Sequence, residues 1–243
     1  MTLADEREDQ LVRDQIEYYR QRAGEYDQWF MRQGRYDRGE VLNRQWWVEV
    51  EQLTEALEAF GPRGRVVEFA CGTGWWTQQL ARHADEVTAV DASAEVMEIN
   101  RRRVGPAGAG KVRYVQADIF AWRPQQRFDV AFFSFWLSHV PPERFEAFWD
   151  VVRSSLAPGG RVFFMDSAYT QTSTARDHTL DGPEATTMTR RLNDGREFRI
   201  VKIFYDPPTL QGRLAHLGWD VAVRPTANFF IYGQGGPVAG NLP

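Results

Sequence analysis

From about Arg65 onward, apolar runs of strand length alternate with segments of helical periodicity. A strand, a helix and a second strand in succession usually form a crossover unit with parallel strands. The alternation therefore predicts an α/β fold with a mostly parallel sheet and helices on both faces. The expected strands are 65–69, 86–90, 112–116, 128–134, 161–166, 198–205 and 220–232, and the expected helices between them are 75–82, 94–104, 142–156 and 208–217.

The length of the chain sets the domain organisation. With 243 residues, the chain is long enough for one α/β domain and short for two. Two helical stretches precede the first strand, near residues 4–22 and 40–59, and should cap the sheet rather than form a domain of their own. The expected divisions are an N-terminal helical cap over 1–60, a cofactor-binding core over 65–167, a substrate lid over 168–195 and C-terminal strands over 196–232.

The C-terminal part contains turn chemistry in two places. Asn193-Asp194-Gly195 is typical of a tight turn, and Asp206-Pro207-Pro208 breaks the chain before a helix. We therefore expect the final pair of strands to be antiparallel at a sheet edge. The glycine-rich tail over 233–243 is expected to be irregular.

Composition narrows the class of protein. No apolar run approaches the roughly 18 residues that a membrane span needs, and the acidic, polar start MTLADEREDQ resembles neither a secretory signal nor a transit peptide. We therefore expect a cytoplasmic protein with no membrane partner. The 29 Lys and Arg residues against 33 Asp and Glu residues give a net charge of −4, which argues against a nucleic-acid partner. Cys71 is the only cysteine, so neither an internal disulfide nor a cysteine metal cage can form.

The segment E-F-A-C-G-T-G-W-W-T-Q-Q-L, from Glu68 to Leu80, places a glycine turn between an expected strand and an expected helix. Such a turn aims backbone N–H groups and the positive end of the helix at the crevice beyond the strand, which favours a nucleotide-like ligand. The dinucleotide fingerprint G-x-G-x-x-G is not met, because the sixth residue from Gly72 is Thr77. The turn therefore disfavours NAD and a nicotinamide oxidoreductase.

Two carboxylates end the next two expected strands. Asp91 closes V-T-A-V-D, where it can accept both hydroxyls of a ribose, and Asp118 closes V-Q-A-D, where it can accept the amino group of an adenine flanked by Ile119. Three successive strand ends thus offer a glycine turn, a ribose carboxylate and an adenine contact. This order predicts an adenosine site without phosphates.

Five motifs in this order resemble those of class I S-adenosylmethionine-dependent methyltransferases of the small-molecule type: E-F-A-C-G-T-G, V-T-A-V-D-A-S, Q-A-D-I, F-D-V-A-F-F-S and L-A-P-G-G-R-V. The resemblance covers about residues 18–232. It implies a Rossmann-like seven-stranded sheet whose last strand is antiparallel beside the fifth. It also implies S-adenosyl-L-methionine as the cofactor.

The resemblance further implies a set of cofactor contacts. Residues of the glycine turn would lie under the methionine part, Asp91 would hold the ribose, and Ser134 would face the sulfonium. The segment Y-Y-R-Q-R-A-G-E-Y-D resembles a signature found ahead of the core in small-molecule members, and implies that Tyr19 and Arg22 close over the methionine carboxylate. The residues expected to bind the cofactor are Tyr19, Arg22, Glu68, Ala70, Gly72, Gly74, Asp91, Ala92, Met97, Asp118, Ile119 and Ser134. Ala70 departs from the commonest form, which has glycine.

Methyl transfer requires mainly that the enzyme position the acceptor beside the methyl group. Methyl transfer from a sulfonium is an in-line displacement, so holding the acceptor and excluding water supply much of the catalysis. A hydroxyl acceptor also needs a base, and His139, just past the fourth expected strand, is the candidate, with a structural loop histidine as an equal alternative. Trp29, Trp136 and His178 are the candidate substrate contacts, because flat rings bind flat or sugar-like acceptors and the lid carries His178.

The function predicted from the sequence is thus transfer of a methyl group to a hydroxyl of a small molecule or saccharide. An N-methyltransferase of a small amine or heterocycle and a non-catalytic accessory protein that binds the cofactor are the alternatives. Arg190 and Lys202 could recognise an anionic acceptor, or could be scattered surface charges. A metal-assisted variant stays open because His139, Asp118 and Asp166 lie at strand ends, although their spacing is no ligand signature. The acceptor and the oligomeric state are not determined by the sequence.

Overall fold

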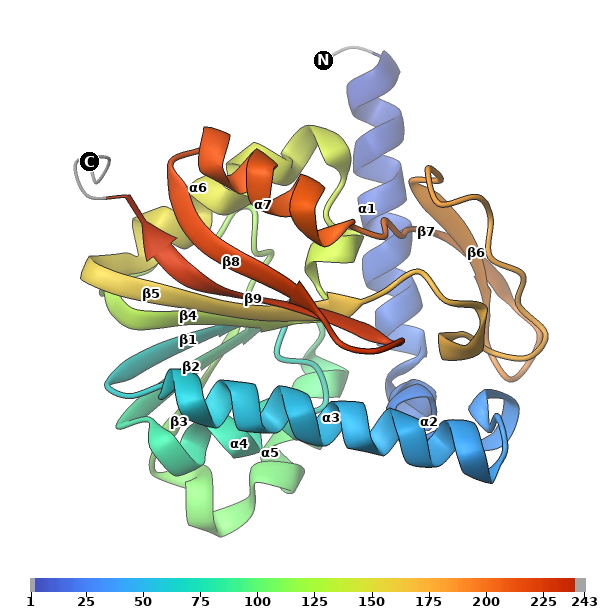
Figure 1. Cartoon of the computed structure of the whole chain (residues 1–243), viewed down its shortest axis with the longest axis horizontal. Helices are drawn as coiled ribbons and strands as arrows, with labels where there is room; N and C mark the ends of the chain where they lie inside the picture. The colour runs from blue at the N-terminus through green and yellow to red at the C-terminus, as the bar shows by residue number, and fades with distance from the viewer. Residues whose placement is uncertain (1–2, 239–243) are drawn as a thin grey trace.

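The computed structural model describes residues 3–238 and has a central seven-stranded sheet with helices on both faces (Figure 1). The strand order is β3-β2-β1-β4-β5-β9-β8, with β1 to β5 parallel and β9 antiparallel to both β5 and β8. This arrangement confirms the predicted Rossmann-like fold and its antiparallel strand beside the fifth. The strands are β1 (Arg65–Phe69), β2 (Glu86–Asp91), β3 (Val112–Gln116), β4 (Phe128–Ser134), β5 (Leu156–Ser167), β8 (Trp219–Pro225) and β9 (Phe230–Pro237).

The central strands are mostly apolar because helices cover both of their faces. In β1, Val66, Val67 and Phe69 are fully buried. One face carries a core that includes side chains from α6 and α7, and the other carries a core that includes side chains from α3 and α4. The α-helices are α1 (Leu3–Gln21), α2 (Tyr26–Phe30), α3 (Glu40–Phe60), α4 (Trp75–His83), α5 (Ala94–Ala109), α6 (Phe145–Ser155) and α7 (Pro207–His216).

The segment 198–205 was expected to form the sixth strand of the main sheet, and this prediction is wrong. Residues Glu197–Val201 form β7, which pairs with β6 (Thr187–Arg191) in a separate antiparallel sheet. The turn Asn193-Asp194-Gly195 joins these two strands, and local pairing across that turn takes β7 away from the main sheet. Figure 1 shows the hairpin, in orange, beside α1. Tyr18 of α1 packs there against Leu192 and Ile200.

The segment 220–232 was expected to be one strand and is two. Strands β8 and β9 are separated by a turn in which Glu49 of α3 accepts hydrogen bonds from the backbone of Asn228 and Phe229. These two strands form an antiparallel pair at the edge of the main sheet, whereas the predicted final pair was 198–205 with 220–232. The predicted irregular tail is wrong up to Pro237, which is still in β9, and residues 239–243 lie outside the described residues.

Within residues 3–238, no helix combines the length and the apolar character needed to cross a bilayer.

Candidate functional site

The site begins at the turn that joins β1 to α4. Ala70, Gly72 and Gly74 all have positive φ angles, of 52°, 51° and 89°. Asn100 of α5 ties this turn down, since its Nδ2 donates to the carbonyl oxygens of Cys71 and Gly72. A Cβ atom on Gly74 would lie 2.6 Å from Cγ of Asn100, so the turn has no room for a side chain there.

Glu68 lies under the turn. Its carboxyl group accepts a hydrogen bond from Thr77 Oγ1 at 2.6 Å, and Thr77 Oγ1 in turn accepts from Asn100 Nδ2 at 2.8 Å. Burial raises the pKa of Glu68 to about 8. Glu68 therefore connects β1, α4 and α5 beneath the turn as a protonated carboxyl group at neutral pH.

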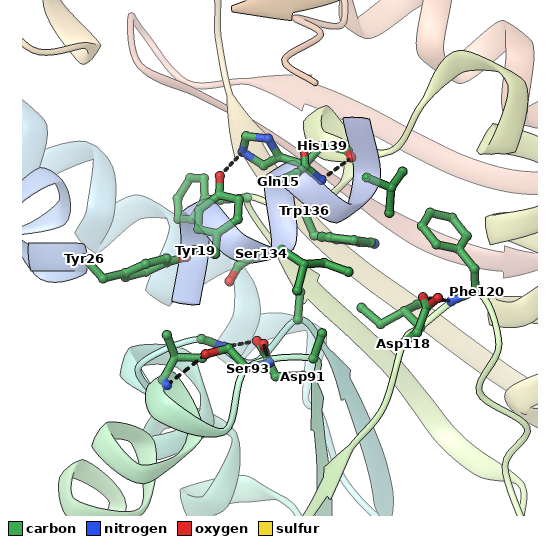
Figure 2. Close-up of a pocket in the computed structure, with 18 residues that line it drawn as sticks. Gln15, Tyr19, Tyr26, Asp91, Ser93, Asp118, Phe120, Ser134, Trp136 and His139 are labelled. Atoms are coloured by element: carbon green, nitrogen blue, oxygen red, sulfur yellow. Dashed lines mark hydrogen bonds between the residues drawn. The ribbon is translucent and has the colours of Figure 1, made fainter. Parts of the chain in front are cut away.

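Asp91, at the end of β2, faces a cavity of about 720 Å³ that we call the main cavity (Figure 2). Its Oδ2 accepts from the backbone N–H of Gly72 and its Oδ1 from that of Ser93, both at 2.9 Å. The carboxylate thus bridges the glycine turn and the start of α5. Burial raises the pKa of Asp91. Ala92, Ser93 and Val96 continue the cavity wall from the end of β2 into α5.

The far end of the main cavity is apolar and partly aromatic. Ile119, Phe120 and Trp136 line it, with the rings of Phe120 and Trp136 6.0 Å apart. Asp118 stands at the rim, where its Oδ1 accepts from the backbone N–H of Phe120 at 3.0 Å. Ser134, at the end of β4, lies between this end and the glycine turn, because it lines both the main cavity and the hollow around the turn. A planar heterocycle with an exocyclic amino group fits these contacts.

A second cavity, of about 550 Å³, adjoins the first, and we call it the cationic cavity. Arg22 from the end of α1, Arg190 from β6 and Lys202 directly after β7 line it. Aromatic rings make up much of the remaining wall, including those of Trp29 and Phe204. The two cavities share four lining residues, Tyr19, Tyr26, Phe135 and His139.

The positive groups of the cationic cavity are held without direct neutralisation, except for Lys202. Its Nζ donates to Ser138 Oγ at 2.8 Å and lies 3.5 Å from Asp166 Oδ1, while burial lowers its pKa to about 8. The Arg22 guanidinium lies over the rings of Tyr18, Tyr26 and Tyr36, 5.4 to 5.9 Å from their centroids. Arg190 donates to Thr174 Oγ1 at 2.7 Å. Among residues 3–238, no carboxylate lines this cavity.

His139 lies where the two cavities meet. It is 6% exposed, and burial lowers its pKa well below the usual value. Its Nδ1 is 2.7 Å from the carbonyl oxygen of Val201, and its Nε2 is 2.9 Å from the hydroxyl of Tyr19 (Figure 2). The side chain of Gln15 joins the same elements, since it donates to the His139 carbonyl and accepts from the Val201 N–H, both at 3.0 Å.

The loop over the cationic cavity is anchored to the segment that follows α1. Trp29 Nε1 donates to the carbonyl oxygen of Ser173 at 2.7 Å, and Arg32 donates to that of Thr172 at 2.9 Å. Arg38 donates to the carbonyl oxygens of Gln171 and Thr174. This loop is therefore held to the segment 29–38 by hydrogen bonds to its backbone.

Comparisons with known proteins agree with this geometry. The profile of a methyltransferase domain matches residues 66–160. The solved structure of DhpI bound to SAM and HEP is 39% identical and superposes with a TM-score of 0.77, covering 93% of this chain and 98% of that one. Its SAH complex gives 38% identity, a TM-score of 0.76 and coverages of 94% and 98%. This chain belongs to the class I S-adenosylmethionine-dependent methyltransferases.

Curated relatives match over shorter stretches. The ubiquinone biosynthesis O-methyltransferase of Xanthomonas euvesicatoria is 29% identical over 147 residues, which is 54% of this chain and 59% of that one. The protein-L-isoaspartate O-methyltransferase of Alcanivorax borkumensis is 29% identical over 125 residues, which is 51% of this chain and 52% of that one. The chain thus spans about half the length of these relatives. Members of this family use S-adenosylmethionine as the methyl donor, so it is the cofactor of this methyltransferase.

The structure places most of the predicted cofactor residues around the main cavity or the glycine turn. Those residues are Tyr19, Ala70, Gly72, Gly74, Asp91, Ala92, Asp118, Ile119 and Ser134. Arg22 lines the cationic cavity, and Glu68 lies under the turn. Met97 is buried in a cluster with Cys71 and Ala89, while α5 presents Val96 to the main cavity.

The three predicted substrate contacts lie at three different cavities. Trp29 lines the cationic cavity, whereas Trp136 lines the main cavity. His178 lines a different hollow on the lid, and its ring nitrogens face Arg35 and Arg190. Burial lowers the pKa of His178 to about 4, with the two arginines adding to the shift. His178 thus reaches the cationic cavity only through Arg190.

Sequence reasoning missed Tyr26 and Phe135, which line both cavities, and did not decide whether Arg190 and Lys202 are contacts of an anionic acceptor or surface charges. The signal that could have found the two cations is the hairpin turn Asn193-Asp194-Gly195, because a hairpin there brings their strands side by side. No group of three or more His, Cys, Asp or Glu residues that could hold a metal ion occurs in the described part of the chain.

Proposed function

We propose that this methyltransferase transfers the methyl group of S-adenosylmethionine to an oxygen of a small anionic molecule bound in the cationic cavity. The observation that supports this proposal is the charge of that cavity. Arg22, Arg190 and Lys202 line it, and among residues 3–238 the one carboxylate that pairs with any of them is that of Asp166, which does not line the cavity. Buried positive groups without full neutralisation favour an anionic ligand.

The same charge argues against an amine as the acceptor. A protonated amine would be repelled by three cations and would find no carboxylate on the cavity wall. Oxygen is therefore the better acceptor atom, in line with the O-methyltransferase names of the curated relatives. The DhpI complex contains SAM and HEP, so a relative of this chain binds HEP together with SAM.

Two kinds of oxygen remain, and different observations favour them. An acid group would present an oxygen that is already deprotonated, so its methylation needs no base and releases no proton. A hydroxyl would need a base, and His139 is the candidate because its Nε2 lies at the boundary of the cationic cavity. We favour the acid group, because Tyr19 occupies Nε2 of His139 and the charges of the cavity select an anion. The hydroxyl of a small molecule or saccharide is the second candidate.

The residues around the main cavity fit the cofactor. The donor and acceptor groups suit adenosine: a carboxylate at the end of β2 for the ribose, and Asp118 beside the flat slot of Ile119 and Trp136 for the adenine. Ala70 and Gly72 would lie under the methionine part, with Ser134 facing the sulfonium. When bound, the cofactor supplies an electrophilic methyl group on a positively charged sulfur. The aromatic rings of Tyr26, Trp29 and Phe135 would exclude water from the line between the two ligands.

The same proposal covers partners and location. A small enclosed acceptor site and a net charge of −4 favour a small-molecule partner over a nucleic acid, and a small-molecule enzyme without a membrane partner suits the cytoplasm. An accessory protein that binds the cofactor without turnover would have no need for a second, charged cavity.

Calorimetric titration with S-adenosylmethionine and with NADH tests the cofactor half of the proposal. The wild type should bind S-adenosylmethionine saturably and should give no signal with NADH. Asp91→Ala should lose most of the affinity, because the ribose would lose its acceptor and the glycine turn its anchor. Unchanged binding in Asp91→Ala would show that the ribose lies elsewhere.

Turnover with radiolabelled S-adenosylmethionine tests the acceptor half, using a panel of carboxylates, phosphate monoesters, phosphonates, phenols, polyols and amines. Products should form with acids, and Arg190→Met and Lys202→Met should each raise KM for them at least tenfold. Proton release at pH 8 separates the two oxygen chemistries. A hydroxyl releases one proton for each methyl transferred, whereas a fully deprotonated acid group releases none. Preference for amines, or for neutral hydroxyls with KM unaffected by the two variants, would refute the anionic acceptor.

A further inference from the structure

Tyr19, Tyr26, Phe135 and His139 line both cavities and therefore form the junction between them. A methyl group that passes from a cofactor in the main cavity to an acceptor in the cationic cavity must cross this junction. The polar atoms at the junction thus act directly on the reacting centre.

The hydrogen bonds of His139 fix where the protons of the junction lie. A carbonyl oxygen can only accept, so His139 Nδ1 carries the proton that it shares with Val201. Burial lowers the pKa of His139 well below its usual value, so the ring is neutral and Nε2 holds a lone pair. The hydroxyl of Tyr19, 2.9 Å away, must therefore be the donor in the bond to Nε2. With that proton committed, Tyr19 offers only oxygen lone pairs to the junction.

An oxygen that presents only lone pairs to the junction can stabilise a positive charge there. The cationic cavity puts Arg22, Arg190 and Lys202 on one side of the junction. A positively charged ligand group at the junction faces repulsion from these three cations. An oxygen that cannot donate, together with the faces of nearby aromatic rings, offsets that repulsion.

We propose that Tyr19, oriented by His139, makes the site select the positively charged sulfonium of S-adenosylmethionine over the neutral thioether of S-adenosylhomocysteine. Tyr19 touches the cofactor in this proposal, and His139 is a positioning residue that acts through it. The spent product then loses an interaction that the methyl donor makes, which favours its release. The inference rests on the proposed function, in which the cofactor lies in the main cavity and its sulfonium faces the cationic cavity, but it does not depend on the chemical identity of the acceptor.

The test compares the Kd of S-adenosylmethionine with that of S-adenosylhomocysteine by calorimetry. Tyr19→Phe keeps the ring that contacts Tyr18 and Tyr26 and removes only the oxygen. We expect this variant to bind S-adenosylmethionine about fivefold more weakly, the size of a contact between an oxygen and a C–H group on the positively charged sulfur. Binding of S-adenosylhomocysteine should change less than about twofold.

Tyr18→Phe is the matched control, because Tyr18 is the preceding residue of α1, is fully buried and has a hydroxyl without a hydrogen-bond partner among the described residues. The ratio of the Kd of S-adenosylhomocysteine to the Kd of S-adenosylmethionine should stay at the wild-type value in this variant. His139→Leu should lower the ratio as Tyr19→Phe does, and the double variant should lower it no further. If His139→Leu does not fold, Tyr19→Phe with its control carries the test.

An equal loss of affinity for both ligands in Tyr19→Phe, or no loss for either, would overturn the inference. A ratio that falls equally in Tyr18→Phe would also overturn it, because removal of any hydroxyl on this helix would then have the same effect. Absence of binding of both ligands by the wild type would instead refute the proposed cofactor site.

Discussion

Lys202 Nζ lies 3.5 Å from Asp166 Oδ1, and the two side chains are only 4% and 1% exposed. Burial lowers the pKa of Lys202 to about 8, with Asp166 opposing the shift. Lys202 therefore loses its proton as the pH rises through about 8, and an anionic acceptor loses one of its three cations.

This relationship predicts the pH dependence of acceptor binding. KM for an anionic acceptor should rise several-fold between pH 7 and pH 9.5 in the wild type, because the neutral lysine no longer attracts the anion. Lys202→Arg keeps its charge over this range, so its KM should stay nearly level. Steady-state kinetics at a series of pH values measures both. A wild-type KM that stays level up to pH 9.5 would contradict the prediction.

Glu68 predicts a pH dependence of stability. Burial raises the pKa of this carboxyl group in the folded state to about 8, above the value of about 4.3 for an unfolded chain. Between these values the folded state binds more protons than the unfolded state, so the free energy of unfolding should fall as the pH rises from 5 to 8. Glu68→Gln cannot titrate and keeps an acceptor for Thr77.

Urea denaturation of both proteins at pH 5, 6, 7 and 8 measures the effect. Glu68→Gln should gain stability relative to the wild type with each step toward pH 8. A difference between the two proteins that is independent of pH would show that Glu68 is ionised in the folded state.

The main sheet and the cofactor end of the site could be predicted from the sequence because their signals are local. Asp91 ends β2 and Asp118 follows the end of β3 by two residues, and a parallel sheet brings such strand ends to one edge. The sequence does not show which sheet the strand after Gly195 joins, because its pattern of residues fits a strand in either sheet. This segment forms β7 and pairs with β6 in the smaller sheet, and the hairpin that results packs against α1.

The acceptor end could not be predicted for a related reason. Arg22, Arg190 and Lys202 come from a helix, a hairpin strand and the residue after its partner, far apart along the chain. Only the docking of the hairpin on α1 turns three scattered charges into one cavity. His139 carried a signal for its position but none for its partner, since Tyr19 lies 120 residues away.

Ala70 predicts a gain in stability. Its φ angle of 52° is in the left-handed region, where a Cβ atom is unfavourable by about 1 kcal/mol. Ala70→Gly should remove this strain and raise the free energy of unfolding by roughly 0.5–1 kcal/mol. Ala84→Gly is the control, because Ala84 has a φ angle of −74° and should lose stability on the same change. Urea denaturation checks the pair, and a loss of stability in Ala70→Gly would contradict the strain.

Gly74 and Gly195 separate the strain of a left-handed conformation from steric exclusion. Their φ angles are 89° and 91°, but a Cβ atom would lie 2.6 Å from Asn100 Oδ1 at Gly74 and in open space at Gly195. Gly195→Ala should cost about 1–2 kcal/mol from the backbone alone. Gly74→Ala adds a collision with the residue that anchors the glycine turn, so it should cost more and also weaken binding of S-adenosylmethionine.

Denaturation gives the stability of both variants, and calorimetry gives their affinity for the cofactor. Cofactor binding should survive in Gly195→Ala, since this turn lies in the hairpin and not at the main cavity. Equal losses of stability in the two variants would mean that Asn100 moves aside at little cost. The hydrogen bonds from Asn100 to the glycine turn would then contribute little to stability, and the turn would be held by its backbone conformation alone.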